Sequence, residues 1–229
     1  MTLQPDNILV NQDYTHFKLC DFGAAMSTAD ATQQSVLGID VGARYYRAPE
    51  LALAYGSASP AADIWALGVT IAEMCSGKIL FTGKTNNEII WSIMSVLGPV
   101  PRVMAAECQR NTYFGSNEKE YFYLQKSIRD SGDPPVTEPE VVVMPRPDRG
   151  TASELLLKKI LPPCLSGNTT TGSGDKSQFA AIRDLLLNKM LCLDPSVRTT
   201  AKRACLDAII SPMDRVVHAL VLADRPGEK

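Results

Sequence analysis

The chain has 229 residues, of which 45% are hydrophobic and 21% are charged, and this is enough for one globular unit with a substantial core. Its net charge is −2, and Lys and Arg are scattered along the sequence, so we expect no direct binding to nucleic acid. No apolar run approaches the roughly 18 residues that span a bilayer, and the start does not resemble a signal peptide. We therefore expect a soluble intracellular protein without membrane association.

The first elements predicted are two short strands. Residues 8–10 and 17–19 are apolar runs separated by a polar turn at 11–14, a pattern typical of a small β-hairpin. Residues 24–43 are rich in Ala, Ser, Thr, Gln and Gly without a sustained period, which predicts a long exposed loop. Loops of that length within a compact domain are usually functional.

A buried helix is predicted next. Ser59 is a suitable N-cap, Pro60 suits the first helical position, and Gly77 is a typical residue at a helix end. Between these signals, apolar residues recur at helical spacing: Ile64, Leu67, Ile71 and Met74. The apolar face of the helix is widened by three further residues, Trp65, Val69 and Ala72. A helix that is apolar on most sides is expected to lie in the core.

The second half alternates helical and irregular patterns. A helix is predicted from about Asn87, as its cap, to Leu97, and it ends at the Gly-Pro pair that follows. Residues 101–175 are predicted to be irregular, with a low-complexity stretch at 166–177. Helical periodicity returns at 179–191, at 200–210 and weakly at 212–220. The sum is a mainly α-helical body with one small β-hairpin near the N-terminus.

Three short motifs occur in order near the start of the sequence. They are residues 5–7 (PDN), 18–23 (KLCDFG) and 46–50 (YRAPE). Each is weak by itself, since Asn and Asp also favour turns. Together and in this order they resemble the end of the catalytic loop, the DFG motif and the APE motif of the eukaryotic serine/threonine protein kinases.

The resemblance implies the C-terminal lobe of the protein-kinase-like fold across residues 1–229. Residues 1–23 would form the end of the catalytic loop and the DFG hairpin, 24–50 the activation segment, and 59–99 the central helices. Residues 100–177 would be an insert with loops, and 178–229 the C-terminal helices. The family transfers a phosphoryl group from ATP to protein hydroxyls, which implies ATP, magnesium and protein substrates.

Two positions match the magnesium ligands of the family. Asn7 stands at the catalytic-loop Asn and Asp21 at the DFG Asp, so the resemblance implies that they bind magnesium and, through it, the nucleotide. An amide and a carboxylate supply the hard oxygen ligands that magnesium prefers. The simpler interpretation is a hairpin whose ends carry turn-forming residues.

Two structural positions also match. Asp63, in the DIWALG sequence at 63–68, stands at the aspartate that braces the catalytic-loop backbone in the family. Arg198 stands at the arginine that pairs with the APE glutamate, here Glu50. If that pair is buried, loss of one partner would cost roughly 3–5 kcal/mol.

The sequence at 44–50 narrows the resemblance to the CMGC group. Arg44, Tyr45 and Arg47 fit the RxYRAPE form of that group, which also carries an insert after the helix predicted at 87–97. Residues 77–87 (GKILFTGKTNN) and 18–25 are similar to the pre-mRNA-processing (splicing) kinases. The resemblance implies splicing factors as substrates and a nuclear, or else cytoplasmic, setting.

The residues at the catalytic positions differ from those of the family. Counting back from Asn7 places Thr2 at the catalytic aspartate and Gln4 at the catalytic-loop lysine, so no catalytic residue is intact. Ala43 replaces the Ser or Thr that contacts both. The Gly-rich loop, the β3 lysine and the αC glutamate are not found, so we expect an N-terminally truncated chain without the ATP-gripping lobe.

A charge in the activation segment suggests a further hypothesis. Asp40 stands where the splicing kinases and their dual-specificity relatives carry a phosphorylated tyrosine. Its carboxylate could partly mimic that charge by pairing with Arg44 or Arg47. A solvated loop acid is the simpler interpretation.

Three hypotheses remain open from the sequence. The first is a serine/threonine kinase that is inactive as the chain stands. The second is a pseudokinase-like module that docks partners through the helix at 87–97 and the insert. An unrelated helical domain with chance motifs is remote, because the motifs stay in order from Asn7 to Arg198.

Overall fold

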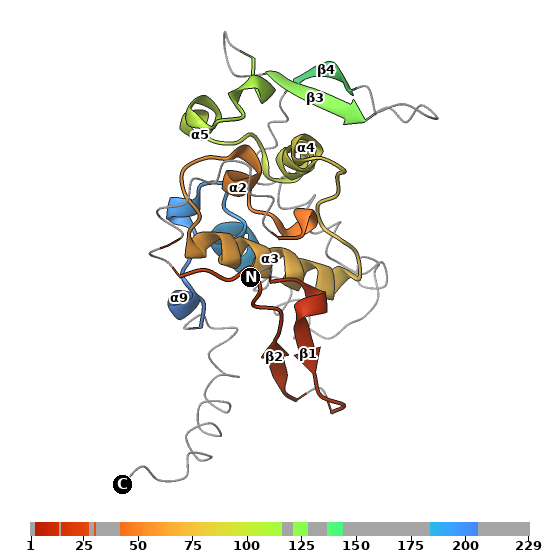
Figure 1. Cartoon of the computed structure of the whole chain (residues 1–229), viewed down its shortest axis with the longest axis vertical. Helices are drawn as coiled ribbons and strands as arrows, with labels where there is room; N and C mark the ends of the chain where they lie inside the picture. Colours follow the sequence, from red (N-terminus) through yellow and green to blue (C-terminus); the bar gives the residue numbers. More distant parts are fainter. Residues whose placement is uncertain are drawn as a thin grey trace.

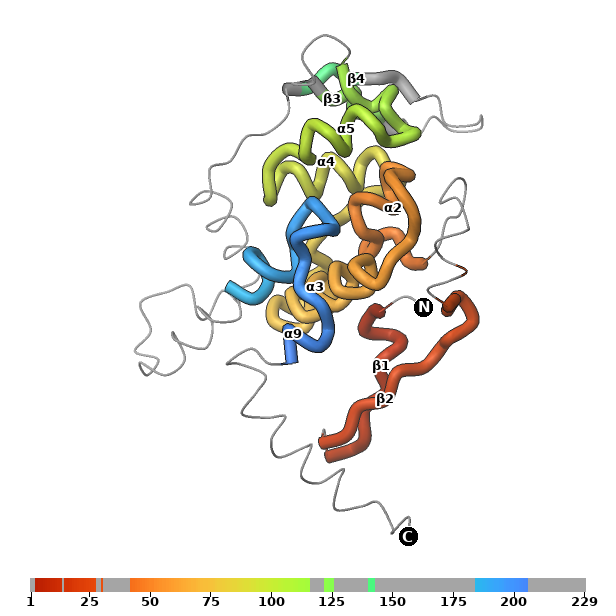
Figure 2. The backbone as a smooth tube through the Cα atoms, turned by 90° about the vertical axis from the view of Figure 1, so that its left-hand side faces the viewer, coloured from red at the N-terminus to blue at the C-terminus, as the bar shows by residue number. Residues whose placement is uncertain are grey.

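The computed structural model describes residues 3–13, 15–27, 30, 42–115, 121–127, 137–143 and 184–205. The molecule is elongated, with one β-hairpin at each end and the helices between them (Figure 1). The tube view, turned by 90°, shows the same order along the long axis (Figure 2). Among the described residues, no helix is long and apolar enough to cross a membrane.

The predicted N-terminal hairpin is confirmed. Strands β1 (Ile8–Val10) and β2 (Phe17–Leu19) pair antiparallel, with Ile8 opposite Leu19. The Asn11 side chain closes the turn, since its Oδ1 accepts the backbone N–H groups of Thr15 and His16 at 2.8 Å each. This local hydrogen bonding explains why a hairpin of only three residues per strand forms here.

Helix α3 (Pro60–Ser76) lies at the centre of the molecule (Figure 1). Its predicted start at Ser59 and end at Gly77 are confirmed, and Gly77 adopts the left-handed conformation with φ 67°. The buried stripe follows Ile64, Trp65, Gly68, Val69 and Ala72. Met74, included in the predicted apolar set, is 62% exposed, because the stripe is centred on Trp65 and Val69.

Helix α4 (Asn86–Leu97) starts earlier than predicted and with another cap. Thr85 is the N-cap, and its hydroxyl accepts the Glu88 N–H at 3.1 Å. The prediction that Asn87 caps the helix was wrong, because Asn87 lies within the first turn and its amide bonds to a strand. Helices α2 (Pro49–Leu53) and α5 (Arg102–Glu107) share a second core cluster with α4.

A second hairpin occurs where the sequence predicted irregular structure. Strands β3 (Tyr121–Ser127) and β4 (Thr137–Val143) pair antiparallel and pack over α4. Phe122 is fully buried and lies 6.0 Å from Trp91 and 5.5 Å from Phe114 between ring centroids. The prediction for 101–175 was therefore wrong at α5, β3 and β4. Residues 116–120, 128–136 and 144–177 of the insert lie outside the described residues.

The C-terminal part packs against α3. The turn η4 (Leu186–Met190) is π-helical, with the Leu191 N–H donating to the Leu186 carbonyl at 2.7 Å. It approaches α3 so closely that a Cβ on Gly68 would lie 3.0 Å from Leu191 Cδ2. Helix α9 (Ala201–Cys205) begins where the helix predicted at 200–210 starts. The remainder of that helix, and the pattern at 212–220, lie outside the described residues.

Candidate functional site

The open end of the β1–β2 hairpin brings Asn7 and Asp21 together. Asn7 ends the 3₁₀ turn η1 (Pro5–Asn7) and is buried, and its carbonyl accepts the Cys20 N–H at 2.9 Å. Asp21 follows Cys20 directly and is exposed, with a left-handed backbone at φ 59°. The strand pairing therefore places an amide and a carboxylate at adjacent positions.

The donor set of this pair is small. Among the described residues, no group of three or more His, Cys, Asp or Glu side chains is arranged to hold a metal ion. Asn7 and Asp21 would supply two oxygen ligands. That number fits magnesium, which usually keeps several waters and takes only one or two protein carboxylates beside substrate phosphates.

The structure describes two of the three departures from the family. Gln4 precedes η1, and its Oε1 is buried without a hydrogen-bond partner in the described part of the chain. Ala43 precedes the 3₁₀ turn η2 (Arg44–Tyr46) and packs against the central core. Thr2 lies outside the described residues.

The segment at 42–47 is held through Arg47. Its buried guanidinium donates to Asn86 Oδ1 at 2.6 Å and to the Gly42 carbonyl at 3.0 Å. Arg44 is half-buried at the start of η2, whereas Tyr45 is exposed. Asp40 lies outside the described residues, so its pairing with Arg44 or Arg47 stays a hypothesis.

Tyr46 forms a contact that sequence reasoning missed. It is buried, and its hydroxyl donates to Glu73 Oε2 on α3 at 2.5 Å. Burial and the Glu73 carboxylate raise the pKa of the Tyr46 hydroxyl well above its ordinary value. The signal in the sequence was Glu73 itself, an acid within a helix that is otherwise mostly apolar.

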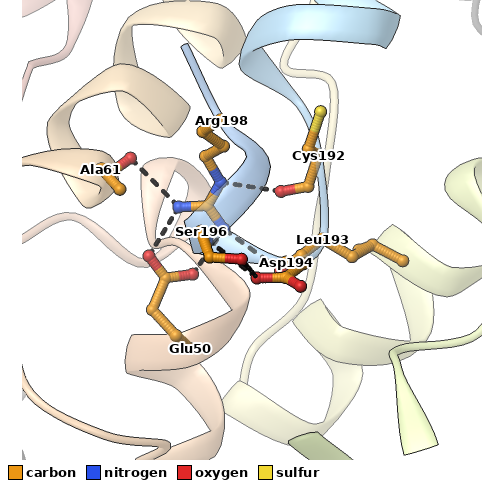
Figure 3. A network of polar contacts seen from close by, with 7 residues as sticks. All are labelled: Glu50, Ala61, Cys192, Leu193, Asp194, Ser196 and Arg198. Carbon is orange, nitrogen blue, oxygen red and sulfur yellow. Dashed lines mark hydrogen bonds and ion pairs between the residues drawn. The ribbon is translucent and has the colours of Figure 1, made fainter. Parts of the chain in front are cut away.

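Glu50 and Arg198 form a buried ion pair, shown close up in Figure 3. The two guanidinium nitrogens Nη1 and Nη2 each donate to one Glu50 oxygen at 2.6 Å. Arg198 also donates to three carbonyls: Cys192 at 2.7 Å, Ala61 at 3.0 Å and Leu193 at 3.3 Å. These bonds use all five donors of the guanidinium, which also lies over the Trp65 ring at 5.1 Å.

Asp63 lies on the first turn of α3. The residue is exposed by its surface area, yet enough protein surrounds its carboxyl for desolvation to raise its pKa. Its predicted role in bracing the catalytic-loop backbone stays a prediction. Thr70 does hold this segment, since its hydroxyl contacts the Leu3 carbonyl at 3.1 Å.

Comparison with known proteins identifies the family. The protein kinase domain model matches residues 1–209, and the chain belongs to that family. The resemblance to the CMGC serine/threonine kinases, with the pre-mRNA-processing kinases among them, is also confirmed. The protein-kinase-like fold, mainly helical with a small hairpin near the N-terminus, is likewise confirmed.

Individual relatives show how much is shared. The serine/threonine-protein kinase prpf4B of Dictyostelium discoideum is 28% identical over 92% of this chain. Extracellular signal-regulated kinase 1 of Candida albicans is 41% identical, and mitogen-activated protein kinase KSS1 of Saccharomyces cerevisiae 38%, each over 42% of the chain. These matches cover 24%, 23% and 27% of the relatives, so the chain spans about a quarter of their length.

The ion pair gives the first prediction. Arg198→Ala strands the buried Glu50 carboxylate and should lower the free energy of unfolding by about 3–5 kcal/mol, measured by urea denaturation. Arg198→Lys keeps the charge but lacks the planar fork, so it should lose less than Arg198→Ala. The double variant Glu50→Leu/Arg198→Met removes both charges and should be less destabilised than Arg198→Ala alone. Equal stability of all variants and the parent would contradict the assignment.

The Tyr46–Glu73 contact predicts a dependence on alkaline pH. Tyrosine in the unfolded chain ionises near about pH 10, whereas folded Tyr46 keeps its proton. The raised pKa therefore contributes stability that is complete below pH 10 and is lost as the pH rises further, by at most about 1.4 kcal/mol per pH unit.

Tyr46→Phe removes this dependence. The variant should be less stable at pH 7 by about 1.5–3 kcal/mol, the range for a hydrogen bond to a charged group. Between pH 9 and 11 its stability should fall less steeply than that of the parent, because the other tyrosines are common to both. Parallel curves for the two proteins would show that Tyr46 is not protected from ionisation.

Proposed function

We propose that the chain forms the C-terminal half of a serine/threonine protein kinase that transfers the γ-phosphoryl group of ATP to protein hydroxyls. The observation that carries this proposal is the hydrogen bond from the Cys20 N–H to the Asn7 carbonyl, which brings Asn7 beside Asp21. The family match over residues 1–209 supports it.

Asn7 and Asp21 would hold magnesium in this proposal. Bound there, magnesium would neutralise charge on the nucleotide phosphates. Asn7 is buried and its backbone is held by hydrogen bonds to Gln4 and Cys20, whereas Asp21 is exposed. One rigid ligand and one accessible ligand suit a site that is completed by the incoming nucleotide.

The surface of the β1–β2 hairpin supports an ATP-binding lobe as its neighbour. Large apolar side chains there are 39–59% exposed: Leu9, Val10, Phe17, Leu19, Phe22 and Met26. Val10, Phe17 and Leu19 share one face of the hairpin by the strand register, and exposed apolar side chains gathered on one face favour an interaction surface. We infer that the ATP-binding lobe of the kinase packs on this hairpin beside Asp21.

The chain lacks the residue types that the family uses at the catalytic base and lysine positions. Thr2 stands at the base position and Gln4 at the lysine position, and neither side chain accepts a proton at neutral pH. Losing a general base typically costs about 10²–10⁴ in rate. We therefore propose that the chain by itself does not catalyse phosphoryl transfer.

The substrates follow from the resemblance to the splicing kinases. The similarity to prpf4B over 92% of the chain supports splicing factors as the substrate class and a nuclear setting. An alternative is a pseudokinase-like docking module that uses α4 and the insert. The departures at Gln4 and Ala43 favour this alternative, because docking needs neither side chain.

Manganese tests the proposed magnesium ligands. Mn²⁺ replaces Mg²⁺ at oxygen sites and broadens nearby NMR signals, so titration of the chain should broaden the Cys20 and Gly23 amides first. Asp21→Ala should abolish this selective broadening, because it removes the exposed ligand. The matched control is Asp13→Ala, an exposed acid at the opposite end of the hairpin, which should change nothing. Unaltered broadening in Asp21→Ala would reject the ligand assignment and favour the docking module.

Nucleotide binding by the chain alone is a separate prediction. The chain presents only one side of the proposed cleft, so magnesium and ATP together should leave its melting temperature unchanged in a thermal-shift titration. A magnesium-dependent rise in the melting temperature that is lost in Asp21→Ala would contradict the proposed inactivity. A rise that survives in Asp21→Ala would place nucleotide binding elsewhere.

A further inference from the structure

A chain of buried polar contacts links the segment at 42–47 to the distant β3–β4 hairpin. It starts at Arg47, whose guanidinium donates to the Gly42 carbonyl at 3.0 Å and to Asn86 Oδ1 at 2.6 Å. Arg47 and Asn86 are both buried. Within 42–47, the Tyr46 N–H donates to the Ala43 carbonyl and the Arg47 N–H to the Arg44 carbonyl. Arg47 therefore clamps a closed turn onto the start of α4.

The next residue continues the contacts on the other side. Asn87 is 1% exposed, its Nδ2 donates to the Tyr123 carbonyl at 2.9 Å, and its Oδ1 accepts the Gln125 N–H at 2.8 Å. In an antiparallel strand the N–H and C=O of one residue point to the same side. Tyr123 and Gln125 therefore turn their backbone groups away from β4 and towards Asn87. The Asn87 side chain thus pairs with β3 away from β4, where Phe114 also forms an isolated bridge with Phe122.

The first turn of α4 is rigid where these two contacts meet. Thr85 Oγ1 accepts the Glu88 N–H at 3.1 Å, and the Lys84 N–H donates to Glu88 Oε2 at 2.6 Å. Gly83 lies so close that a Cβ there would be 2.8 Å from the Ile89 nitrogen. These contacts hold the backbone of Asn86 and Asn87 in one turn, so the two side chains are positioned together.

We propose that Asn86 and Asn87 are positioning residues that couple the β3–β4 hairpin to the 42–47 segment through Arg47. Loss of the Asn87 hydrogen bonds to β3 releases the Arg47 clamp, and loss of the clamp weakens those bonds. The coupling is a property of the packed polar contacts and does not depend on phosphoryl transfer, so it stands or falls separately from the proposed function. A partner that binds the β3–β4 hairpin would therefore change the stability of the 42–47 segment.

Residue-resolved amide hydrogen exchange on the 229-residue chain tests the coupling. Asn87→Ala removes both bonds to β3 and should speed exchange at the Tyr46 and Arg47 amides by about fivefold, the lower range of coupling between distant sites. Coupling is reciprocal, so Asn86→Ala should speed exchange at the Gln125 amide by a similar factor. The Val69 amide in the middle of α3 should change less than twofold in both variants.

A matched control separates the polar contacts from general loosening of the insert. Phe122→Leu weakens the aromatic contacts of β3 with Trp91 and Phe114 but leaves the Asn87 side chain in place. It should speed exchange in β3 and leave Tyr46 and Arg47 within twofold. If Asn87→Ala does not fold, Asn87→Asp keeps the acceptor for Gln125 and removes the donor to Tyr123, and it carries the same expectation.

Three results would overturn the coupling. Exchange at Tyr46 and Arg47 that stays within twofold in the Asn87 variant would show that the clamp is independent of β3. An equal rise in Phe122→Leu would show that any loosening of the insert is sufficient. A proportional rise at Val69 would show that the variants lower global stability instead.

Discussion

The Glu50–Arg198 pair is the interaction on which the arrangement of the central body depends. It joins residues 148 positions apart, and the remaining donors of the guanidinium bind two further backbone segments, at Ala61 and at Cys192 and Leu193. The cost of burying two charges is offset only because every donor has an acceptor and the geometry is bidentate. The start of α2, the start of α3 and the turn after η4 are thus fixed relative to one another by a single side chain.

Helix α3 connects this ion pair to the segments next to the candidate site. Two of its polar groups hold other segments: the Thr70 hydroxyl contacts the Leu3 carbonyl, and Glu73 accepts the Tyr46 hydroxyl. Both contacts lie along the helix beyond Trp65, which stacks on Phe81. A helix that is buried on most sides can thereby position both the segment before Asn7 and the segment before Glu50.

The sequence predicted correctly those features that depend on neighbouring residues, such as the ends of helix α3. Ser59, Pro60 and Gly77 bounded α3 correctly, because caps and helix ends are set by the residues next to them. Asn87 misled the prediction of α4, because its amide serves a tertiary bond to β3 and Thr85 caps the helix instead. The β3–β4 hairpin was missed although Tyr121–Leu124 and Val141–Val143 have strand-forming composition, since the surrounding proline-rich and charged sequence dominated the pattern. Motif order located Asn7 and Asp21 together, but no spacing could place Glu73 against Tyr46.

In this kinase-family chain, the residues that hold the fold together differ from those at the catalytic positions. The scaffold depends on side chains that each bond to another segment: Glu50, Arg198, Thr70 and Tyr46. By contrast, Gln4 leaves a buried oxygen without a partner in the described region, and Ala43 offers only a methyl group. Among the described residues, the side-chain hydrogen bonds that build the body involve neither of these last two side chains, although Ala43 packs against the central core. The hydrogen bonds of α3 and α4 therefore do not depend on the side chains at these two positions, and the surfaces that the fold presents do not require phosphoryl transfer. The Arg47–Asn86 clamp belongs to the scaffold set, which is why it can be tested by hydrogen exchange alone.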